Sequence, residues 1–278
     1  MAQVEVDGLQ LHVEQQGSGP TVVLLHGFTG STTTWGSLTE LLSPEFEVIA
    51  IDIVGHGESD APAEVDRYRM ERCTDDLVAV LAKLGHERAT WLGYSMGART
   101  ALQLAVRHPK GVDALVLEGV TAGLPDAAER AARIASDEVL ANRLDAEGLE
   151  AFIDFWQSIG LWDTQVGMPA ERIAALREQR MGSDPVGLAN SLRGMGAGAQ
   201  EPVTDHLGEV NAPVLLVAGS LDQKFTGIAQ ELLDALPRAE FAAIEGVGHA
   251  AHFEDAGAFN SVVLEYLRRM HSGGVGRS

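Results

Sequence analysis

Six short, almost continuously apolar runs recur along the chain, several of them flanked by glycine. They cover residues 21–27, 47–52, 89–95, 114–119, 213–219 and 240–246. Helical patterns lie between them, for example at 69–84 and 96–107. Apolar strands that alternate with helices are typical of a mostly parallel sheet covered by helices on both faces. The sequence therefore predicts an α/β fold.

The two ends of the chain depart from this rhythm. Residues 4–17 alternate apolar and polar side chains around the Asp7-Gly8 pair, which predicts an N-terminal β-hairpin. The C-terminal stretch HSGGVGRS, residues 271–278, is rich in glycine and polar residues, and we expect it to be disordered.

The alternation of strand and helix stops between residues 121 and 200. This stretch shows no convincing strand, several amphipathic helical segments and the turn-like sequences GSDPVG and RGMGAGAQ. The strand pattern resumes at Pro213. We therefore predict a helical cap at 121–200, inserted into an α/β core formed by residues 1–120 and 201–278.

The charge balance limits the partners that the protein can have. The chain has 40 acidic and 20 basic residues, a formal net charge of −20, which argues against nucleic acid or an anionic membrane as a partner. No apolar run is long enough to span a bilayer, and the first residues lack a signal-peptide pattern, so we expect a cytoplasmic protein. The single cysteine, Cys73, lies in no metal-ligand spacing. The sequence leaves the oligomeric state open, as a monomer or a small homo-oligomer.

Residues 93–97 read GYSMG and fit the G-x-S-x-G pattern of a nucleophile elbow. The motif follows an apolar run and precedes a helical pattern, which is the strand–turn–helix setting that the elbow requires. Glycines on both sides allow the close backbone approach and the strained dihedral angles that expose the serine. The sequence predicts Ser95 as a catalytic serine.

A catalytic serine needs a base, and the base needs an orienting acid. His249 follows the last apolar run in GVGHAAHFED, and Asp222 follows the preceding run in VAGSLDQKF. The chain order Ser95, Asp222, His249 is the order in which enzymes with a nucleophile elbow of this kind carry their serine, acid and histidine. The rival candidates, for which structural roles are better explanations, are His26, His56, His252 and Asp52.

Backbone N–H groups are expected to form the oxyanion site. The sequence LHGFTG at 25–30 follows an early strand and can supply the N–H of Phe28, and Met96, directly after the serine, can supply the second. The alternative is that HGFTG is only a tight turn at the end of a strand.

Together, LLHGFTGS, DIVGHGESD, GYSMGAR, AGSLDQKF and GVGHAAHFED resemble the α/β-hydrolase superfamily along essentially the whole chain. The cap sequences, above all RGMGAGAQ and the DQKF after the acid, resemble the 2-succinyl-6-hydroxy-2,4-cyclohexadiene-1-carboxylate synthases of menaquinone biosynthesis. The resemblance implies an elimination that expels pyruvate from a cyclohexene polycarboxylate, with a Ser-His-Asp triad and no metal or organic cofactor.

The resemblance also implies the residues that bind this small-molecule substrate. They are Tyr94, Arg99, Arg133 and Arg177, with Phe155 or Trp156 as the aromatic residue that packs on it. Two positions depart from the family pattern: Ala98 replaces a glycine, and no proline follows the glutamate of HFEDAG. Neither departure affects a residue expected to carry out the chemistry.

Converging arginines suit a substrate with several carboxylates, whereas a neutral ester has no use for them. Pairing with cap acids such as Glu129, Asp137 and Glu178 is the alternative. For Arg130, Arg180 and Arg193, that alternative is at least as good an interpretation.

Two other functions remain open from the sequence. A serine hydrolase, acting on a small ester or on a carbon–carbon bond, would use the same triad. A binding protein with a non-catalytic α/β-hydrolase fold would keep the triad without turnover.

Overall fold

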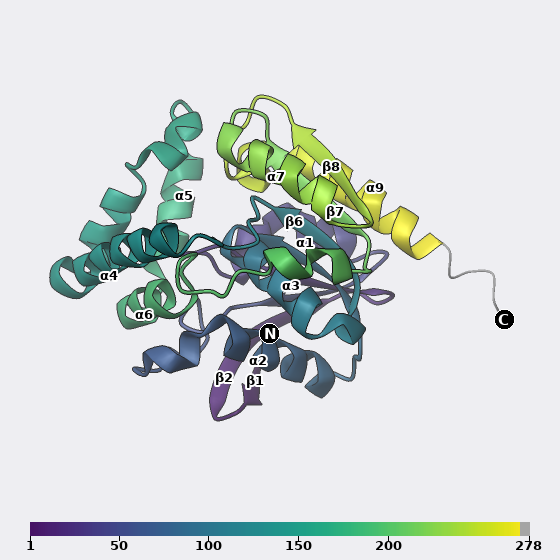
Figure 1. Cartoon of the computed structure of the whole chain (residues 1–278), viewed down its shortest axis with the longest axis horizontal. Coiled ribbons are helices and arrows are strands. Elements are labelled where there is room, and N and C mark those ends of the chain that lie inside the picture. Colours follow the sequence, from purple (N-terminus) through teal and green to yellow (C-terminus); the bar gives the residue numbers. More distant parts are fainter. Residues whose placement is uncertain (273–278) are drawn as a thin grey trace.

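The computed structural model describes residues 1–272, so most of the tail predicted to be disordered, residues 273–278, lies outside the described part. Eight strands form one sheet in the order β1-β2-β4-β3-β5-β6-β7-β8, parallel except for antiparallel pairing of β2 with β1 and β4 (Figure 1). The mostly parallel α/β sheet is confirmed. The strands are β1 Ala2–Val6, β2 Leu9–Gln16, β3 Thr21–Leu25, β4 Glu47–Ile51, β5 Ala89–Tyr94, β6 Val112–Glu118, β7 Val214–Gly219 and β8 Ala239–Ile244.

The N-terminal hairpin also forms as predicted. β1 and β2 are joined by Asp7 and Gly8, whose φ angles are 43° and 78°. A two-residue turn with both φ angles positive matches the twist of the strands, and glycine adopts this conformation without strain.

Helices cover both faces of the sheet, which explains why the central strands are almost continuously apolar. In β3, Val23 and Leu25 belong to one core cluster, whereas Val22 and Leu24 belong to the other. Because side chains alternate between faces of a strand, a strand buried on both sides has few polar positions. The helices of the first face are α2 Met70–Lys83, α3 Met96–Arg107 and α7 Gln223–Ala235, and those of the second are α1 Gly36–Leu42 and α9 Ala256–His271.

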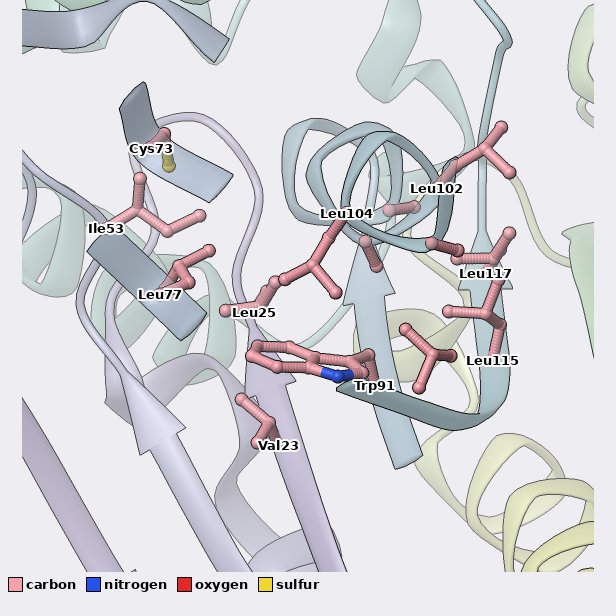
Figure 2. Close-up of a cluster of buried hydrophobic side chains, with 14 of the residues drawn as sticks. Val23, Leu25, Ile53, Cys73, Leu77, Trp91, Leu102, Leu104, Leu115 and Leu117 are labelled. Atoms are coloured by element: carbon pink, nitrogen blue, oxygen red, sulfur yellow. The ribbon is translucent and has the colours of Figure 1, made fainter. Parts of the chain in front are cut away.

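The centre of the first core is the indole of Trp91 on β5. Figure 2 shows it among leucine side chains from neighbouring strands and from α3. Its Nε1–H donates a 3.0 Å hydrogen bond to the carbonyl of Gly111, so the one polar atom of this buried ring is satisfied. This packing fixes β5 and α3, the two elements that meet at Ser95.

Between β6 and β7 the chain forms only helices, which pack on one another beside the sheet (Figure 1). They are α4 Ala127–Trp156, the 3-10 helix η4 Gly160–Gln165, α5 Ala170–Met181, α6 Pro185–Met195 and the 3-10 helix η5 Thr204–Glu209, which lies against α3 and α7. α4 is capped by Asp126, the residue before it, and is kinked at Gly148, where φ is 80°. α4 and α6 share a small apolar cluster that includes Phe152 and Leu188. Within residues 1–272, no helix is long and apolar enough to cross a membrane.

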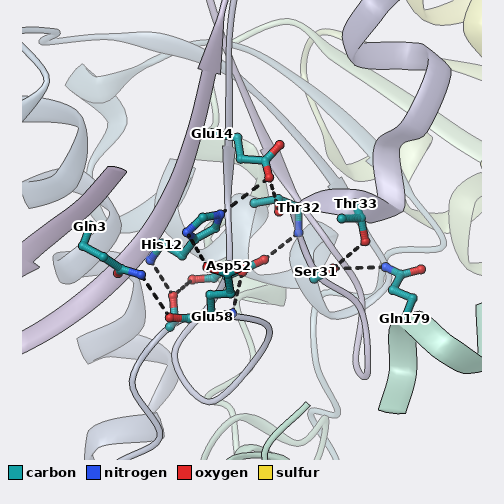
Figure 3. Close-up of polar contacts among 10 residues, drawn as sticks. Gln3, His12, Glu14, Ser31, Thr32, Thr33, Asp52, Glu58 and Gln179 are labelled. Carbon is teal, nitrogen blue, oxygen red and sulfur yellow. Dashed lines mark hydrogen bonds and ion pairs between the residues drawn. The ribbon is translucent and has the colours of Figure 1, made fainter. Parts of the chain in front are cut away.

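A buried polar network holds the loops after β3 and β4. Asp52 accepts hydrogen bonds from the amides of Thr32 and Glu58, at 2.5 and 2.8 Å (Figure 3). The ring Nε2 of His26 accepts from the amide of Ile53 at 3.0 Å. Asp52 and His26 therefore position backbone, as the sequence favoured, and neither contacts the predicted serine.

The two buried histidines of these loops predict acid sensitivity. Burial lowers the pKa of His26 to about 4 and that of His56 to about 3. In the unfolded chain both titrate near pH 6.5, so below that pH the unfolded state binds more protons. The free energy of unfolding should therefore fall as the pH drops from about 6.5 towards 4, by on the order of 1 kcal/mol per pH unit for each histidine.

Urea unfolding at pH 7, 6 and 5 measures this loss. In His56→Asn the free energy of unfolding should fall less steeply over that range, because one of the two titrating groups is gone. Parallel pH dependences in the variant and the wild type would contradict this assignment.

Candidate active site

Ser95 lies at the tight turn between β5 and α3, with φ 49° and ψ −104°. A Cβ atom at Gly97 would lie 2.0 Å from the carbonyl oxygen of Leu25, and one at Gly93 would lie 2.3 Å from that of Gly97. Only glycine fits these two positions, so the turn can hold the serine in a conformation that non-glycine residues rarely adopt. The Ser95 amide donates a 2.8 Å hydrogen bond to the carbonyl of Glu118 at the end of β6.

Ser95, His249 and Asp222 form a hydrogen-bonded chain. The Nε2 of His249 lies 3.2 Å from the Ser95 hydroxyl oxygen, and its Nδ1 lies 2.8 Å from Oδ2 of Asp222. Since a carboxylate only accepts, Nδ1 carries the proton and Nε2 can accept the serine proton. The three residues follow β5, β7 and β8, whose carboxyl ends meet at one edge of the parallel sheet.

Asp222 has a second role at the start of α7. Its Oδ1 accepts from the amide of Phe225 at 3.2 Å and caps this helix. Burial alone would raise the pKa of the carboxyl, but the hydrogen bond from His249 and the Phe225 amide bring it below its ordinary value. Asp222 is therefore ionised at neutral pH and can stabilise a protonated His249.

Phe28 and Met96, the expected oxyanion residues, line the same cavity as Ser95. Over residues 1–272, the amide of neither residue donates a hydrogen bond to another protein group. Both N–H groups are thus available to a ligand beside the serine, although their role in catalysis stays a prediction.

The cavity above Ser95 has a volume of about 320 Å³ and is enclosed by the carboxyl edge of the sheet and by cap residues. Four of the predicted substrate-binding residues line it: Tyr94, Arg99, Arg133 and Trp156. Trp162 and Leu192 from the cap add apolar surface, and the exposed Lys224 lies at its rim. Pockets of this kind, apolar with a few polar groups, are typical of small-molecule sites.

Arg99 and Arg133 are held by different partners. Arg99 is buried and donates to the carbonyl of Met195 at 3.0 Å and to the side chain of Gln200. Burial, with the charge of Arg133 nearby, lowers the pKa of Arg99 to about 10. The Nε of Arg133 donates to both oxygens of the buried Asp137, at 2.9 and 3.0 Å, which leaves its two terminal nitrogens for a ligand.

The predictions for Arg177 and Phe155 are not met by this arrangement, because neither residue lines the cavity. Arg177 donates to Glu150 at 3.0 Å and to Asp154 at 2.9 Å on the outer side of the cap. The ring of Phe155 packs under the guanidinium of Arg143, 4.0 Å from its centroid. Of the two adjacent aromatic residues, Trp156 is the one that faces the cavity.

Arg180 is the cap arginine for which the sequence left open a choice between pairing with a cap acid and a place at the site. Its side chain is buried over the ring of Trp162, 4.9 Å from the centroid, and burial lowers its pKa to about 10. Its Nη1 has no hydrogen-bond partner in the described part of the chain. The hydroxyl of Tyr94 is likewise buried and unpartnered, and both residues line a small side chamber that shares Phe28, Tyr94 and Trp162 with the main cavity.

The remaining arginines considered from the sequence are explained by local contacts. Arg193 pairs with Glu138 and Asp145, and Arg130 donates to the carbonyls of Leu124 and Pro125. Within residues 1–272, no cluster of three or more histidine, cysteine, aspartate or glutamate side chains is arranged to hold a metal ion.

Comparison with known proteins agrees with this geometry. The family model described as the α/β hydrolase fold matches residues 20–256. A provisionally named 2-succinyl-6-hydroxy-2,4-cyclohexadiene-1-carboxylate synthase of Bacillus subtilis (strain 168) is 39% identical, over 94% of this chain and 96% of that protein. The synthase of that name from Enterobacter sp. (strain 638) is 30% identical, over 90% and 92% of the two chains.

Solved structures give the same grouping. MenH from S. aureus superimposes with a TM-score of 0.89 at 30% identity, covering 93% of this chain and 98% of that one. An esterase from Thermogutta terrifontis, solved with malate bound, has a TM-score of 0.86 at 27% identity and covers 97% of each chain. By sequence and by structure, the chain belongs to the α/β hydrolase fold family and, within it, to the family of the 2-succinyl-6-hydroxy-2,4-cyclohexadiene-1-carboxylate synthases.

Proposed function

We propose that the protein is a carbon–oxygen lyase of menaquinone biosynthesis. It would eliminate pyruvate from a cyclohexene carboxylate that carries a succinyl group and an enolpyruvyl ether, and would release 2-succinyl-6-hydroxy-2,4-cyclohexadiene-1-carboxylate. The observation that carries this proposal is the set of arginines, Arg99, Arg133 and Arg180, at the cavity that contains Ser95 and in its side chamber. Relatives named for this reaction support it.

The charges near Ser95 suit an anionic substrate. Although the chain as a whole has a net charge of −20, the two arginines of the main cavity are accompanied by one buried acid, Asp137. Asp137 pairs with Arg133 and also lies close enough to Arg99 for their charges to interact. With Arg180 in the adjoining chamber, three guanidinium groups are offered to carboxylates, whereas the acids beside Ser95, Asp222 and Glu118, are each hydrogen-bonded to a histidine.

The proton transfers follow from the triad geometry. His249, oriented by Asp222, takes the proton of the Ser95 hydroxyl, and the serine oxygen then removes a proton from the carbon α to the succinyl ketone. The electron pair left on carbon forms the new ring double bond as the carbon–oxygen bond of the ether breaks. Enolpyruvate departs as an anion, accepts the proton held by His249, which returns the triad to its starting state, and becomes pyruvate by tautomerisation.

Stabilisation of the developing anion comes from donors that are already in place. The amides of Phe28 and Met96 can receive negative charge on the ketone oxygen. Burial raises the pKa of Tyr94 well above its ordinary value, with the charge of Glu118 adding to the effect, so its phenol remains a hydrogen-bond donor. With pKa values near 10, Arg99 and Arg180 remain charged at neutral pH.

The test is release of pyruvate from the authentic cyclohexene precursor, followed beside hydrolysis of p-nitrophenyl acetate. We expect kcat/KM for the precursor to exceed that for the ester by orders of magnitude, because a neutral ester uses none of the arginines. Strong ester turnover without release of pyruvate would overturn the lyase assignment.

The second candidate is a serine hydrolase acting on a small carboxylate ester. The structural similarity to the Thermogutta terrifontis esterase, at 27% identity, favours it, and the triad would serve that reaction equally well. In this case Ser95 would form an acyl-enzyme, which trapping by rapid quench and mass spectrometry would detect. The lyase reaction forms no covalent intermediate.

A further inference from the structure

Glu118 is a buried carboxylate that the proposed chemistry does not use. It is the last residue of β6, its side chain is 1% exposed, and it follows the apolar residues Val116 and Leu117. A carboxylate in such a place costs desolvation free energy, which its hydrogen bonds at best offset. Stability alone therefore does not favour a glutamate at this position.

Glu118 is hydrogen-bonded both to Ser95 and to the segment that follows His249. Its main-chain carbonyl accepts from the Ser95 amide at 2.8 Å. Its side chain accepts twice from His252, at 3.1 Å from the backbone N–H and at 2.8 Å from Nδ1. One residue thus fixes both the turn that carries the serine and the segment that begins three residues after His249.

On the side of β7, the loop that carries His249 is held by hydrogen bonds from the Leu221 amide to the carbonyl of Val247 and from the Gly246 amide to the Ser220 hydroxyl. On the side of β6, next to Ser95, its hydrogen bonds in the described structure are those with Glu118. Asp222 orients the imidazole from one side, and Glu254, from the same segment as His252, accepts from the amides of Gly248 and Ala250. The His249 ring also packs against the strand end: a Cβ atom at Gly119 would lie 2.9 Å from its Cε1. Hence the height of the ring above β6 depends on how the loop is held at Glu118.

Tyr94 links the same contact to the substrate cavity. Its ring lies between the two histidines, with centroids 4.4 Å from His252 and 5.4 Å from His249. A shift of the His252 ring would therefore displace the ring of His249 by two routes, through the ring of Tyr94 and through the loop that joins the two histidines.

We propose that Glu118 is a positioning residue that sets the distance between Ser95 and His249 by clamping His252. The inference rests on the proposed roles of Ser95 and His249. It assigns to Glu118 and His252 a function that acts through the triad, without contact with the substrate.

Four variants test this clamp, the pair of hydrogen bonds between Glu118 and His252. Glu118→Ala removes both bonds and His252→Leu removes the side-chain bond, whereas Glu118→Gln and His252→Asn preserve the hydrogen bonds in part. In Glu118→Ala, kcat for pyruvate release should fall about 100-fold, since a misplacement of about 1 Å costs that much, while KM stays within about threefold. Labelling of Ser95 by a fluorophosphonate should slow in parallel. Glu118→Gln should stay within about fivefold of the wild type, because its amide can accept from the His252 N–H and donate to Nδ1.

His252→Asn provides the test from the other partner, because an asparagine Nδ2 can replace the histidine Nδ1 as donor to Glu118. Its activity should also stay close to that of the wild type, whereas His252→Leu, which keeps only the backbone bond, should lose activity. Glu240→Gln is the matched control, because Glu240 pairs with Arg269 on the exposed surface of the described chain.

Thermal unfolding of each variant separates positioning from folding. If Glu118→Ala folds, and its labelling and turnover equal those of the wild type, the clamp is disproved. The clamp is also disproved if Glu118→Gln is as impaired as Glu118→Ala, or if His252→Asn is as impaired as His252→Leu. If Glu118→Ala does not fold, the comparison of His252→Leu with His252→Asn decides. A wild-type protein that releases no pyruvate and resists labelling would instead contradict the proposed function.

Discussion

Replacing Ser95 by alanine should lower kcat for pyruvate release by about 10²–10⁴-fold, the range that a positioned general base contributes. The hydroxyl is the group through which His249, 3.2 Å away, would act on the substrate. Substrate binding should stay within about threefold, because the arginines and Trp156 do not depend on the hydroxyl for their positions. Single-turnover kinetics and calorimetric binding to the variant measure the two quantities separately.

The size of this loss also distinguishes the two reactions. When a serine attacks a carbonyl, its removal costs about 10⁶-fold in kcat, because the covalent route disappears. A loss of that size, together with a trapped acyl-enzyme, would favour the hydrolase. Ser158→Ala, which changes an exposed cap serine bonded to the carbonyl of Phe155, is the control. Unchanged turnover in Ser95→Ala would remove the triad from the mechanism altogether.

The core of the fold could be predicted because its sequence signals are local. The continuous apolar runs follow from burial on both faces of the sheet, and Asp7-Gly8 specifies a turn by its backbone alone. The spacing of glycines around Ser95 and the positions of Asp222 and His249 after successive strands were equally informative. In a parallel sheet, the carboxyl ends of the strands meet at one edge regardless of the sequence distance between them.

The cap could not be predicted as well, because residues on one helix share their spacing but not their surroundings. Arg177 and Arg180 lie three residues apart on α5, and both match the pattern of a pocket-facing arginine. Which of them faces the cavity depends on how α5 lies against the core. Two of the hydrogen bonds that hold this helix are tertiary, from Gln179 to Ser31 at 3.3 Å (Figure 3) and to Thr34 at 2.7 Å.

Hydrogen bonds between segments that are distant in the chain could not be predicted from the sequence either. Arg99 is bonded to Met195 and Gln200, about 100 residues away along the chain, and the clamp between Glu118 and His252 spans 134 residues. The stretch RGMGAGAQ stood out as a family-like sequence. The structure gives it a physical reason, since Gln200 holds the arginine one turn after the serine, and a Cβ atom at Gly196 would lie 2.5 Å from Asp137.

Arg180→Met should raise KM for the precursor by about 10–100-fold, the effect of losing charge-assisted hydrogen bonds worth about 1.5–3 kcal/mol. The guanidinium is buried, its Nη1 has no partner in the described structure, and it lies over Trp162 beside the cavity. A buried charge without a partner is unfavourable for folding, and methionine fills a similar volume without a charge. The melting temperature of Arg180→Met should therefore be equal to or higher than that of the wild type, while substrate affinity falls.

Arg177→Ala is the matched control from the same helix. Its guanidinium pairs with Glu150 and Asp154 at the surface, where ion pairs contribute little to stability, so KM and kcat should stay within about twofold of the wild type. A higher melting temperature together with a lower substrate affinity in Arg180→Met would identify Arg180 as a residue that binds the substrate and lowers the stability of the folded protein. If KM rises in Arg177→Ala and not in Arg180→Met, the prediction from sequence is right and the role inferred for Arg180 is wrong.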